Sequence, residues 1–300
     1  MVEWPEKLTD LKLRGHFNEP VVDVVWPRSL EKLVFGNFFN QPILGVGWPR
    51  HLTLLRFGMM FNQPIEGMAW PTSLKQLKLG DSFNKPVLGV NFNNVVHLEF
   101  GYNFNQPIEG VSLPRSLEKF KVGDLFNQPI VDVGWPEALE ELEFGRFFNN
   151  PVVGIKWPKL KFLRFGVCFD KPVDGVDILE VERVEFGFNF NHPVVSVTWP
   201  KLKHLKFGQA FNHPIVGVKF PEILHLEFGN DFNQPVAGLN FPEILHLSFG
   251  KRFNHSIFGA EWPKVERLEF GADFCGRVCF GGATGVEVEI GPGFKKFSVL

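Results

Sequence analysis

Tyrosine is almost missing from this chain, whose 300 residues contain one Tyr beside 35 Phe. An ordinary core contains both phenylalanine and tyrosine rings. The scarcity of tyrosine therefore predicts a stacked core in which a phenolic hydroxyl would find no hydrogen-bond partner. Cysteine is also scarce, since Cys168, Cys275 and Cys279 are too few for a disulfide framework. The composition therefore favours a core built from stacked apolar side chains rather than from cross-links.

The chain also lacks an excess of either charge, because 31 Lys and Arg against 33 Asp and Glu give a net charge of −2. Proteins that bind nucleic acid or anionic membranes usually carry a basic excess, so we expect neither partner. No apolar run approaches the roughly 18 residues that cross a bilayer. The N-terminal residues show neither the basic nor the apolar region of a signal peptide, which favours a cytoplasmic protein.

A repeat of 21 or 22 residues covers almost the whole chain. One repeat, from Pro27 to Trp48, reads PRSLEKLVFGNFFNQPILGVGW. The pair Phe-Asn marks eleven of thirteen repeats, and Phe169-Asp170 and Phe274-Cys275 mark the other two; the Phe-Asn pairs begin at Phe17, Phe39, Phe61, Phe83, Phe104, Phe126, Phe148, Phe190, Phe211, Phe232 and Phe253. Such self-similarity predicts a solenoid in which each repeat stacks on its neighbours.

Each repeat contains one short strand, as the alternation of Leu33 and Phe35 with outward residues illustrates. A glycine follows this strand in twelve repeats, where the chain needs either a positive φ or a close approach of two backbones. Two prolines in a typical repeat exclude a long helix. Because each repeat advances by one strand spacing, we expect parallel strands joined by extended or 3-10 segments on the convex side.

Three kinds of side chain are expected to form columns inside the stack. The Phe of Phe-Asn and the Phe at the strand end form two of them. The Trp before Pro alternates with a Val two residues earlier and also points inward, with a sugar-binding platform as the alternative. The Asn of Phe-Asn is expected to be buried and to bond the backbone of the next repeat.

The shared pattern L-x-x-L-x-F-G-x-x-F-N-Q-P-I, over roughly residues 4–274, resembles the FNIP repeat, a leucine-rich-repeat-like unit of slime moulds, other protists and giant viruses. It departs from ordinary leucine-rich repeats, because Asn40 follows Phe35 by five residues rather than three. The resemblance implies a curved solenoid, a role in protein interaction and no catalytic residues. We predict a mainly β, right-handed leucine-rich-repeat-like solenoid over residues 1–274, with about 13 repeats and one parallel sheet on its concave face.

The pattern breaks after Phe274, and residues 275–300 are expected to form a C-terminal cap. A solenoid needs such a cap because its terminal repeat exposes a core face. Within this segment, residues 286–290 alternate as in an edge strand between glycine-rich turns.

Two outward-facing columns of the sheet offer a first candidate surface. The position between Leu and Phe alternates in sign from Lys78 to Glu227, which indicates either an ion-pair ladder that fixes the register or a charged binding face. One position earlier, three histidines follow one another between two arginines; they are Arg183, His204, His225, His246 and Arg267.

This histidine column has three interpretations: a metal site, a pH-sensitive or ligand-binding patch, and a passive solvated column. Metal ligands must converge on one point, whereas these side chains lie in a line, so we expect no metal. Glu185 and Glu227, in the neighbouring column, are expected to bond the histidines.

A second candidate surface lies between the glycine and Phe-Asn, where two positions vary most among the repeats of this chain. A scaffold that fixes its other positions and frees these two has a natural specificity surface there. Apolar groups at these positions either tuck under the loop or contact a partner. Over both surfaces, the candidate partner-binding residues are Arg56, Met59, Met60, Tyr102, Phe162, Arg164, Arg183, Phe188, His204, His225 and His246.

Sequence signatures of enzymes are absent: the chain has no phosphate-binding loop, no nucleophile elbow and no zinc-protease motif. The grouped acids Glu140, Glu141 and Glu143 lie beside Lys119 and Lys121, which favours a solvated ion network over a catalytic pair. We therefore predict a monomeric scaffold that binds another protein and needs no cofactor or metal. The alternatives are a structural spacer without a ligand and, more remotely, a polysaccharide-active β-helix enzyme.

Overall fold

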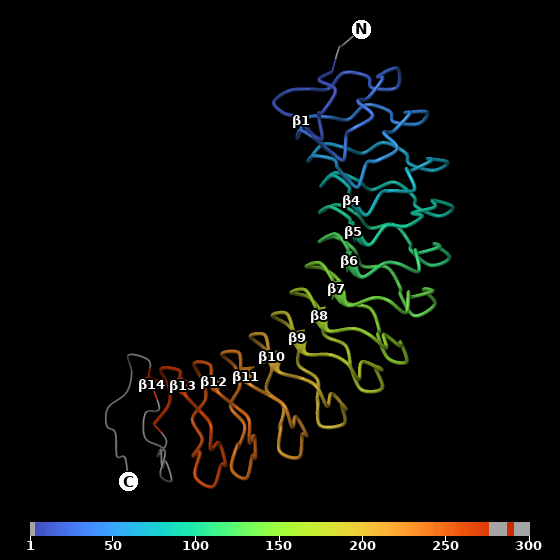
Figure 1. Cartoon of the computed structure of the whole chain (residues 1–300). Coiled ribbons are helices and arrows are strands. Elements are labelled where there is room, and N and C mark those ends of the chain that lie inside the picture. The colour runs from blue at the N-terminus through green and yellow to red at the C-terminus, as the bar shows by residue number, and fades with distance from the viewer. Residues whose placement is uncertain (1–3, 276–286, 291–300) are drawn as a thin grey trace. The chain divides into compact units, whose positions relative to one another are not determined.

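The computed structural model describes residues 4–275 and the backbone of residues 287–290. The chain divides into two compact halves, residues 1–150 and 151–300. Each half is a stack of repeats that each contribute one strand (Figure 1). Helices are absent from the described residues, so none of these residues forms a helix that could cross a membrane.

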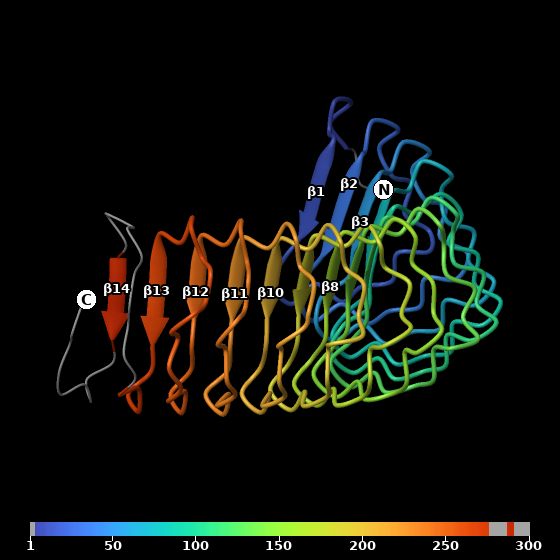
Figure 2. The ribbon, with the colours of Figure 1, turned by 90° about the horizontal axis from the view of Figure 1, so that it is seen from below.

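The strands of each half form a parallel sheet in strict register. In the N-terminal half these are β1 (Asp10–Leu13), β2 (Lys32–Phe35), β3 (Leu54–Arg56), β4 (Gln76–Lys78), β5 (His97–Glu99), β6 (Lys119–Lys121) and β7 (Glu141–Glu143). In the C-terminal half they are β8 (Phe162–Arg164), β9 (Arg183–Glu185), β10 (His204–Lys206), β11 (His225–Glu227), β12 (His246–Ser248), β13 (Arg267–Phe270) and β14 (Glu287–Ile290). Figure 2 shows the strands of the C-terminal half side by side and pointing the same way. The predicted parallel, mainly β solenoid is confirmed.

The segments between strands consist of single turns and extended stretches. The N–H of Leu30 donates to the carbonyl of Pro27 at 3.1 Å, which closes a turn just before β2. A second turn, in which the N–H of Val46 donates to Ile43, places Gly45 at a φ of 84°. The sequence predicted extended or 3-10 segments between the strands. The structure has extended stretches and single turns of this kind instead of 3-10 helices in the described residues.

Aromatic rings fill the interior as two neighbouring columns. The Phe-Asn rings of Phe39 and Phe61 stack with centroids 6.2 Å apart and an interplanar angle of 6°. Within a repeat, the strand-end ring of Phe100 stacks on Phe104 at 3.9 Å. Phe104 is fully buried, and its neighbours on both sides are again phenylalanines. A tyrosine hydroxyl would face only carbon there, which explains the scarcity of tyrosine.

The tryptophan column belongs mainly to the core, as expected. Five of its members are buried: Trp26, Trp70, Trp157, Trp199 and Trp262. The other three, Trp4, Trp48 and Trp135, are half-buried. In the N-terminal half, Trp26 stacks between Trp4 and Trp48 at 6.2 and 6.5 Å, so the rings cover one another instead of forming an open sugar platform.

The asparagines form a hydrogen-bonded ladder along the stack. The N–H of Asn40 donates to Oδ1 of Asn18 at 2.8 Å, and the N–H of Asn62 donates to Oδ1 of Asn40 at 2.9 Å. The predicted bond to the next repeat is confirmed. The expectation of burial is wrong, because the amides lie at the edge of the stack and are half-buried or exposed.

The glycine after each strand is required by close backbone approach rather than by a positive φ. A Cβ on Gly101 would lie 2.2 Å from the carbonyl oxygen of Gly80, and a Cβ on Gly208 would lie 1.8 Å from that of Gly187. No side chain fits at such distances. The left-handed glycines lie in the other turn, as Gly45 does, except for Gly15 in the first repeat.

Of the predicted C-terminal cap, residues 275–300, the structure describes Cys275 and the backbone of residues 287–290. Its predicted strand is present as β14, which pairs in parallel with β13. Residues 276–286 and 291–300 of the predicted cap lie outside the described residues.

Candidate binding surface

The solvent-facing side of the sheet, here called the sheet face, carries the first and third residues of each short strand. In β4, Leu77 is buried while Gln76 and Lys78 are half-buried, and most other three-residue strands repeat this alternation. The alternation follows from the strand period of two residues. The apolar column therefore enters the core, and two polar columns are left on the sheet face.

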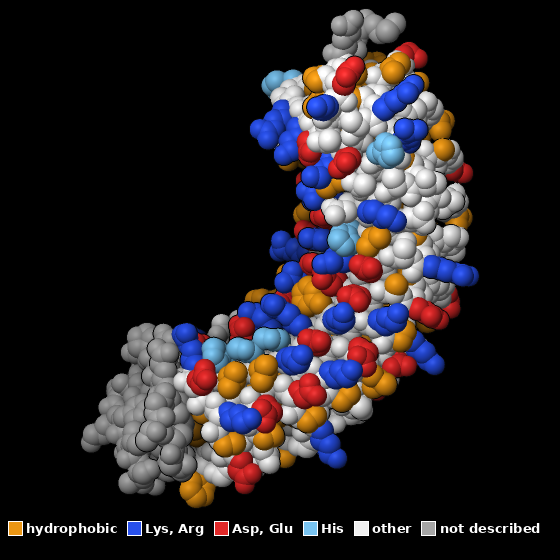
Figure 3. Space-filling model, in the orientation of Figure 1, with side chains coloured by type: hydrophobic (Ala, Val, Ile, Leu, Met, Phe, Trp, Pro, Cys, Tyr) orange, Lys and Arg blue, Asp and Glu red, His pale blue; other side chains and the backbone are white. Residues whose placement is uncertain are grey.

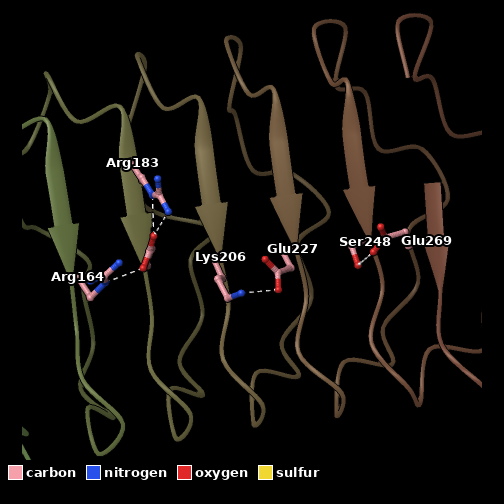
Figure 4. A network of polar contacts seen from close by, with 7 residues as sticks. Arg164, Arg183, Lys206, Glu227, Ser248 and Glu269 are labelled. Carbon is pink, nitrogen blue, oxygen red and sulfur yellow. Dashed lines mark hydrogen bonds and ion pairs between the residues drawn. The ribbon is translucent and has the colours of Figure 1, made fainter. Parts of the chain in front are cut away.

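Opposite charges on neighbouring strands pair along the third-residue column. In the N-terminal half, Nζ of Lys78 lies 2.7 Å from Oε1 of Glu99. In the C-terminal half, Lys206 pairs with Glu227 at 2.6 Å, and the hydroxyl of Ser248 donates to Glu269 at 2.9 Å (Figure 4). The ion-pair interpretation is confirmed for Lys78 with Glu99 and for Lys206 with Glu227. Because the groups are partly exposed, each pair contributes about 1 kcal/mol or less, so the pairs favour the correct register rather than hold the fold together.

Phe162, Arg164 and Arg183 form one cluster on β8 and β9. Both guanidinium carbons lie over the Phe162 ring, at 5.2 Å for Arg164 and 5.5 Å for Arg183, which are distances of cation–π contacts. Both arginines also donate to Glu185 through Nε at 2.7 Å (Figure 4). Burial by itself would raise the pKa of Glu185, but these hydrogen bonds and charges outweigh it and hold that pKa below its usual range.

The three predicted histidines lie on adjacent strands with their rings in contact. The rings of His204 and His225 stack with centroids 4.4 Å apart and an angle of 8°. His246 meets His225 edge to face at 4.5 Å. A row of histidine side chains is visible on the C-terminal half in Figure 3.

The expected bonds from Glu185 and Glu227 to these histidines are not present. Glu185 is held by two arginines, and Glu227 is held by Lys206, its neighbour in the same column. Oε2 of Glu266, 3.9 Å from Nε2 of His246, is the only carboxylate oxygen that reaches the column among the described residues. Glu185 and Glu227 are already bound to cations, and the imidazoles of the column contact one another instead.

Protonation of His204 and His225 is disfavoured. Partial burial, then the positive charges of Arg183 and Lys203, lower the pKa of His204, against a smaller opposing effect of Glu182. Partial burial and the two neighbouring histidines likewise lower the pKa of His225, against Glu266. These lowered pKa values favour the neutral forms of His204 and His225 at neutral pH.

The histidine column forms the floor of an open depression of about 420 Å³, bordered by Arg183 and Arg267. Smaller depressions of about 200 and 260 Å³ lie on the sheet face of the N-terminal half, and Arg56 lines both of them. Within residues 4–275 no three His, Cys, Asp or Glu side chains are placed to hold a metal ion. The arrangement can offer stacking surfaces and hydrogen-bond donors to a ligand.

The strand-exit loops, the two residues between the glycine and Phe-Asn, carry exposed apolar side chains. Met59 and Met60 are 52% and 48% exposed, and Tyr102 and Phe188 are 46% and 54% exposed. These side chains do not tuck under the loop. The loop backbone is nonetheless regular, because the N–H of Met60 donates to the carbonyl of Asn37 in the preceding repeat.

The structure groups the predicted residues unevenly. Six of them share the sheet face of the C-terminal half: Phe162, Arg164, Arg183, His204, His225 and His246. Arg56 lies on the sheet face of the N-terminal half, while Met59, Met60, Tyr102 and Phe188 lie on the strand-exit loops. Sequence reasoning missed another exposed apolar column, which includes Leu44, Leu88, Val216 and Phe258. The available signal was their position directly before the left-handed glycine of each turn.

Comparisons with known proteins agree with this architecture. The model of the FNIP repeat matches residues 39–82, 61–92 and 83–125. A solved structure of CroV588, described as a novel circular LRR protein, is similar with a TM-score of 0.79 and 34% sequence identity. The match covers 97% of this chain and 47% of that chain, so this chain spans about half the length of that protein. None of the curated proteins matches the chain in sequence.

Proposed function

Because this chain is a FNIP-repeat protein with a leucine-rich-repeat-like fold, we propose that it is a scaffold that binds another protein through its sheet face and strand-exit loops. The difference between core and outward positions within each repeat supports this proposal. Core columns repeat the same residue type, whereas the outward positions differ from one repeat to the next. A surface that varies on a fixed frame is suited to recognition.

The observation that carries the proposal is the exposure of large apolar side chains on the strand-exit loops. Neighbouring repeats carry Phe38, Met59 and Met60, all of them exposed. The loop backbone is held by bonds that any residue makes, so the fold does not require these side chains. Adjacent exposed apolar groups are typical of protein interfaces, where methionine and aromatic residues are enriched.

We propose a protein partner rather than a nucleic acid because the charges on the sheet face pair with one another. Lys78, Lys119 and Lys206 each face a carboxylate within 2.7 Å, so these cations are not an uncompensated basic surface. A non-catalytic, monomeric and cytoplasmic scaffold remains our proposal. A structural spacer without a ligand is the alternative that the experiment below distinguishes.

The test compares three folded baits in affinity capture from a lysate of the native cell. One bait is the wild type, and the second carries Met59→Ser, Met60→Ser and Phe188→Ser on the strand-exit loops. The third, a matched control, carries Leu44→Ser, Leu88→Ser and Val216→Ser, which also removes three exposed apolar groups but from the opposite turn. Circular dichroism verifies that all three baits are folded.

A partner retained by the wild type and the control and lost from the strand-exit variant supports the scaffold. Equal capture by all three baits contradicts the assignment to these loops and favours the spacer.

A further inference from the structure

The histidine column is the part of the C-terminal sheet face whose potential charge is not balanced. The permanent cations around it are paired: Arg183 with Glu185, Arg267 with Glu269 and Lys206 with Glu227, at 2.7, 2.6 and 2.6 Å. His204 and His225 have no carboxylate within 4 Å among the described residues. Protonation of His204 and His225 would therefore add positive charge that no carboxylate within 4 Å cancels among the described residues.

The geometry leaves these rings accessible to a ligand. His246 is exposed, His204 and His225 are half-buried, and all three line the depression of about 420 Å³. Neighbouring strands are about 4.8 Å apart, so the column is about 10 Å long, the length of three residues of extended chain. An extended peptide segment matches that length.

Charged groups of every neighbouring strand face the column and set its electrostatics. From the strand positions they are Arg183 and Glu185 of β9, Lys206 of β10, Glu227 of β11, and Arg267 and Glu269 of β13. Just before the strands, Glu182, Lys203 and Glu266 act on the histidines. Apart from the histidines, these nine groups sum to −1, with four cations and five carboxylates. The histidines therefore decide the sign of this surface.

Resting on the proposed function, we propose that the histidine column is a pH-dependent binding site for an extended, carboxylate-rich segment of the partner protein. The ligand's carboxylates accept hydrogen bonds from the imidazolium N–H groups, and Arg183 and Arg267 border the two ends. Binding takes up protons, because a bound carboxylate favours the charged imidazole.

The direction of the pH effect follows from the histidines. The pKa values of His204 and His225 in the free protein lie below the usual value of about 6.5, and a bound anion raises them. Affinity therefore rises as the pH falls from 7.5 to 5.5. Glutamate side chains of the ligand, with an ordinary pKa of about 4.3, stay ionised over this range.

The experiment uses a fluorescein-labelled octapeptide of alternating Glu and Ser as the probe and the full chain as the receptor. Fluorescence anisotropy gives Kd at pH 5.5, 6.5 and 7.5 at constant ionic strength. We expect binding at least about ten-fold tighter at pH 5.5 than at pH 7.5, the change that an added interaction of about 1.4 kcal/mol produces. A matched peptide with Gln in place of Glu is expected not to bind.

Two triple variants test whether the pH dependence of binding arises from the histidine column. The column variant H204Q/H225Q/H246Q is expected to lose the pH dependence. The control variant changes three other histidines of the same half, H192Q/H213Q/H255Q, whose Nε2 atoms lie near backbone carbonyls at 3.3, 2.8 and 3.1 Å. Gln occupies this position in other repeats and makes the same bond, as Gln234 does to Asn212, so the control is expected to behave like wild type.

Several outcomes overturn the inference. They are equal affinity at all three pH values, a column variant that binds like wild type, and no binding of the Glu peptide at pH 5.5. Tighter binding of a matched phosphoserine peptide at pH 7.5 also overturns it, since that result assigns the site to phosphates. The capture experiment changes no histidine, so a partner captured through the strand-exit loops leaves the proposed function standing in each of these cases.

Discussion

The two halves of the chain have the same interior and different sheet faces. Phe100 stacks on Phe104 at 3.9 Å in the N-terminal half, and Phe228 stacks on Phe232 at 3.9 Å in the C-terminal half. The first strand position, however, mixes residue types from Asp10 to Glu141 in the N-terminal half. From β8 to β13 in the C-terminal half it holds only aromatic or basic residues: Phe162, Arg183, His204, His225, His246 and Arg267. The repeat therefore determines the core residues of each turn of the solenoid, whereas the residues on the sheet face can differ from one half to the other.

Even the hydrogen-bonded edge differs between the halves. In the N-terminal half, Gln41 and Gln63 donate through Nε2 to the carbonyls of Asn18 and Asn40. In three repeats of the C-terminal half a histidine takes the place of glutamine, as where His213 lies 2.8 Å from the carbonyl of Asn191. Six of the nine histidines lie in residues 151–300. We therefore expect the C-terminal half to respond to pH more strongly than the N-terminal half.

The largest expected effect tests whether the interiors are equivalent. Phe104→Ala and Phe232→Ala each remove a fully buried ring that stacks on three or more phenylalanines. Each change is expected to lower the free energy of unfolding by about 3–5 kcal/mol. Urea denaturation followed by circular dichroism measures both, and losses that differ by more than about 2 kcal/mol would break the equivalence.

The glycine columns provide the next test. Gly101→Ala and Gly229→Ala place a Cβ 2.2 and 1.8 Å from a glycine carbonyl oxygen of the preceding repeat, so the backbones must separate. We expect each to cost about 3 kcal/mol or more, as an overpacked contact with backbone does.

The matched controls are Gly47→Ala and Gly134→Ala, where a Cβ meets nothing within 4 Å and φ is not positive. Thermal melting of all four variants decides the matter. A control that melts as early as the test variants would contradict close approach as the cause.

A smaller effect is expected along the asparagine ladder. Oδ1 of Asn105 accepts from the N–H of Asn127 and from Gln128, and Oδ1 of Asn212 accepts from the N–H of Asn233 and from Gln234. Asn→Ala at positions 105 and 212 removes the acceptor of the backbone N–H of Asn127 and Asn233, whereas Gln128 and Gln234 keep their bonds to the backbone carbonyls of residues 105 and 212. Each change is expected to cost about 1–2 kcal/mol in either half.

Asn→Asp at the same two positions keeps the acceptor, as Asp170 does for Asn191 at 3.0 Å. Denaturation midpoints of the Asp variants are therefore expected to stay near wild type. Equal losses for Ala and Asp would show that the acceptor oxygen is not what matters.

The smallest effect sharpens the difference between the halves. Because the pKa values of His204 and His225 are lowered in the folded protein, the unfolded chain binds more protons. Their contribution to stability is present above the unfolded pKa of about 6.5 and is lost as the pH falls through the folded pKa values. Hydrogen exchange is expected to show β10 and β11 losing protection between pH 7 and pH 5 more than β3 and β4. The variant H204Q/H225Q removes this difference, and a variant that keeps it would contradict the assignment.

The sequence alone predicted the solenoid because thirteen repeats in register allow only stacked, parallel rungs. It also predicted the inward columns, since Phe39 and Phe61 recur at a fixed spacing and alternate with outward residues. The sign pattern from Lys78 to Glu227 predicted the ion pairs for the same reason: strand register brings equivalent positions side by side.

Contacts between different columns were decided only by the tertiary structure. Spacing cannot tell that Glu185 turns to Arg164 and Arg183 rather than to His204, because the choice depends on side-chain reach and on competing charges. Spacing also cannot show that Met59 and Phe188 stay exposed. Nor can it show that the glycine after a strand is required because the backbone of the preceding repeat leaves no room for a Cβ. Repetition determines which positions are neighbours, whereas the packing of side chains in three dimensions determines which neighbours bind.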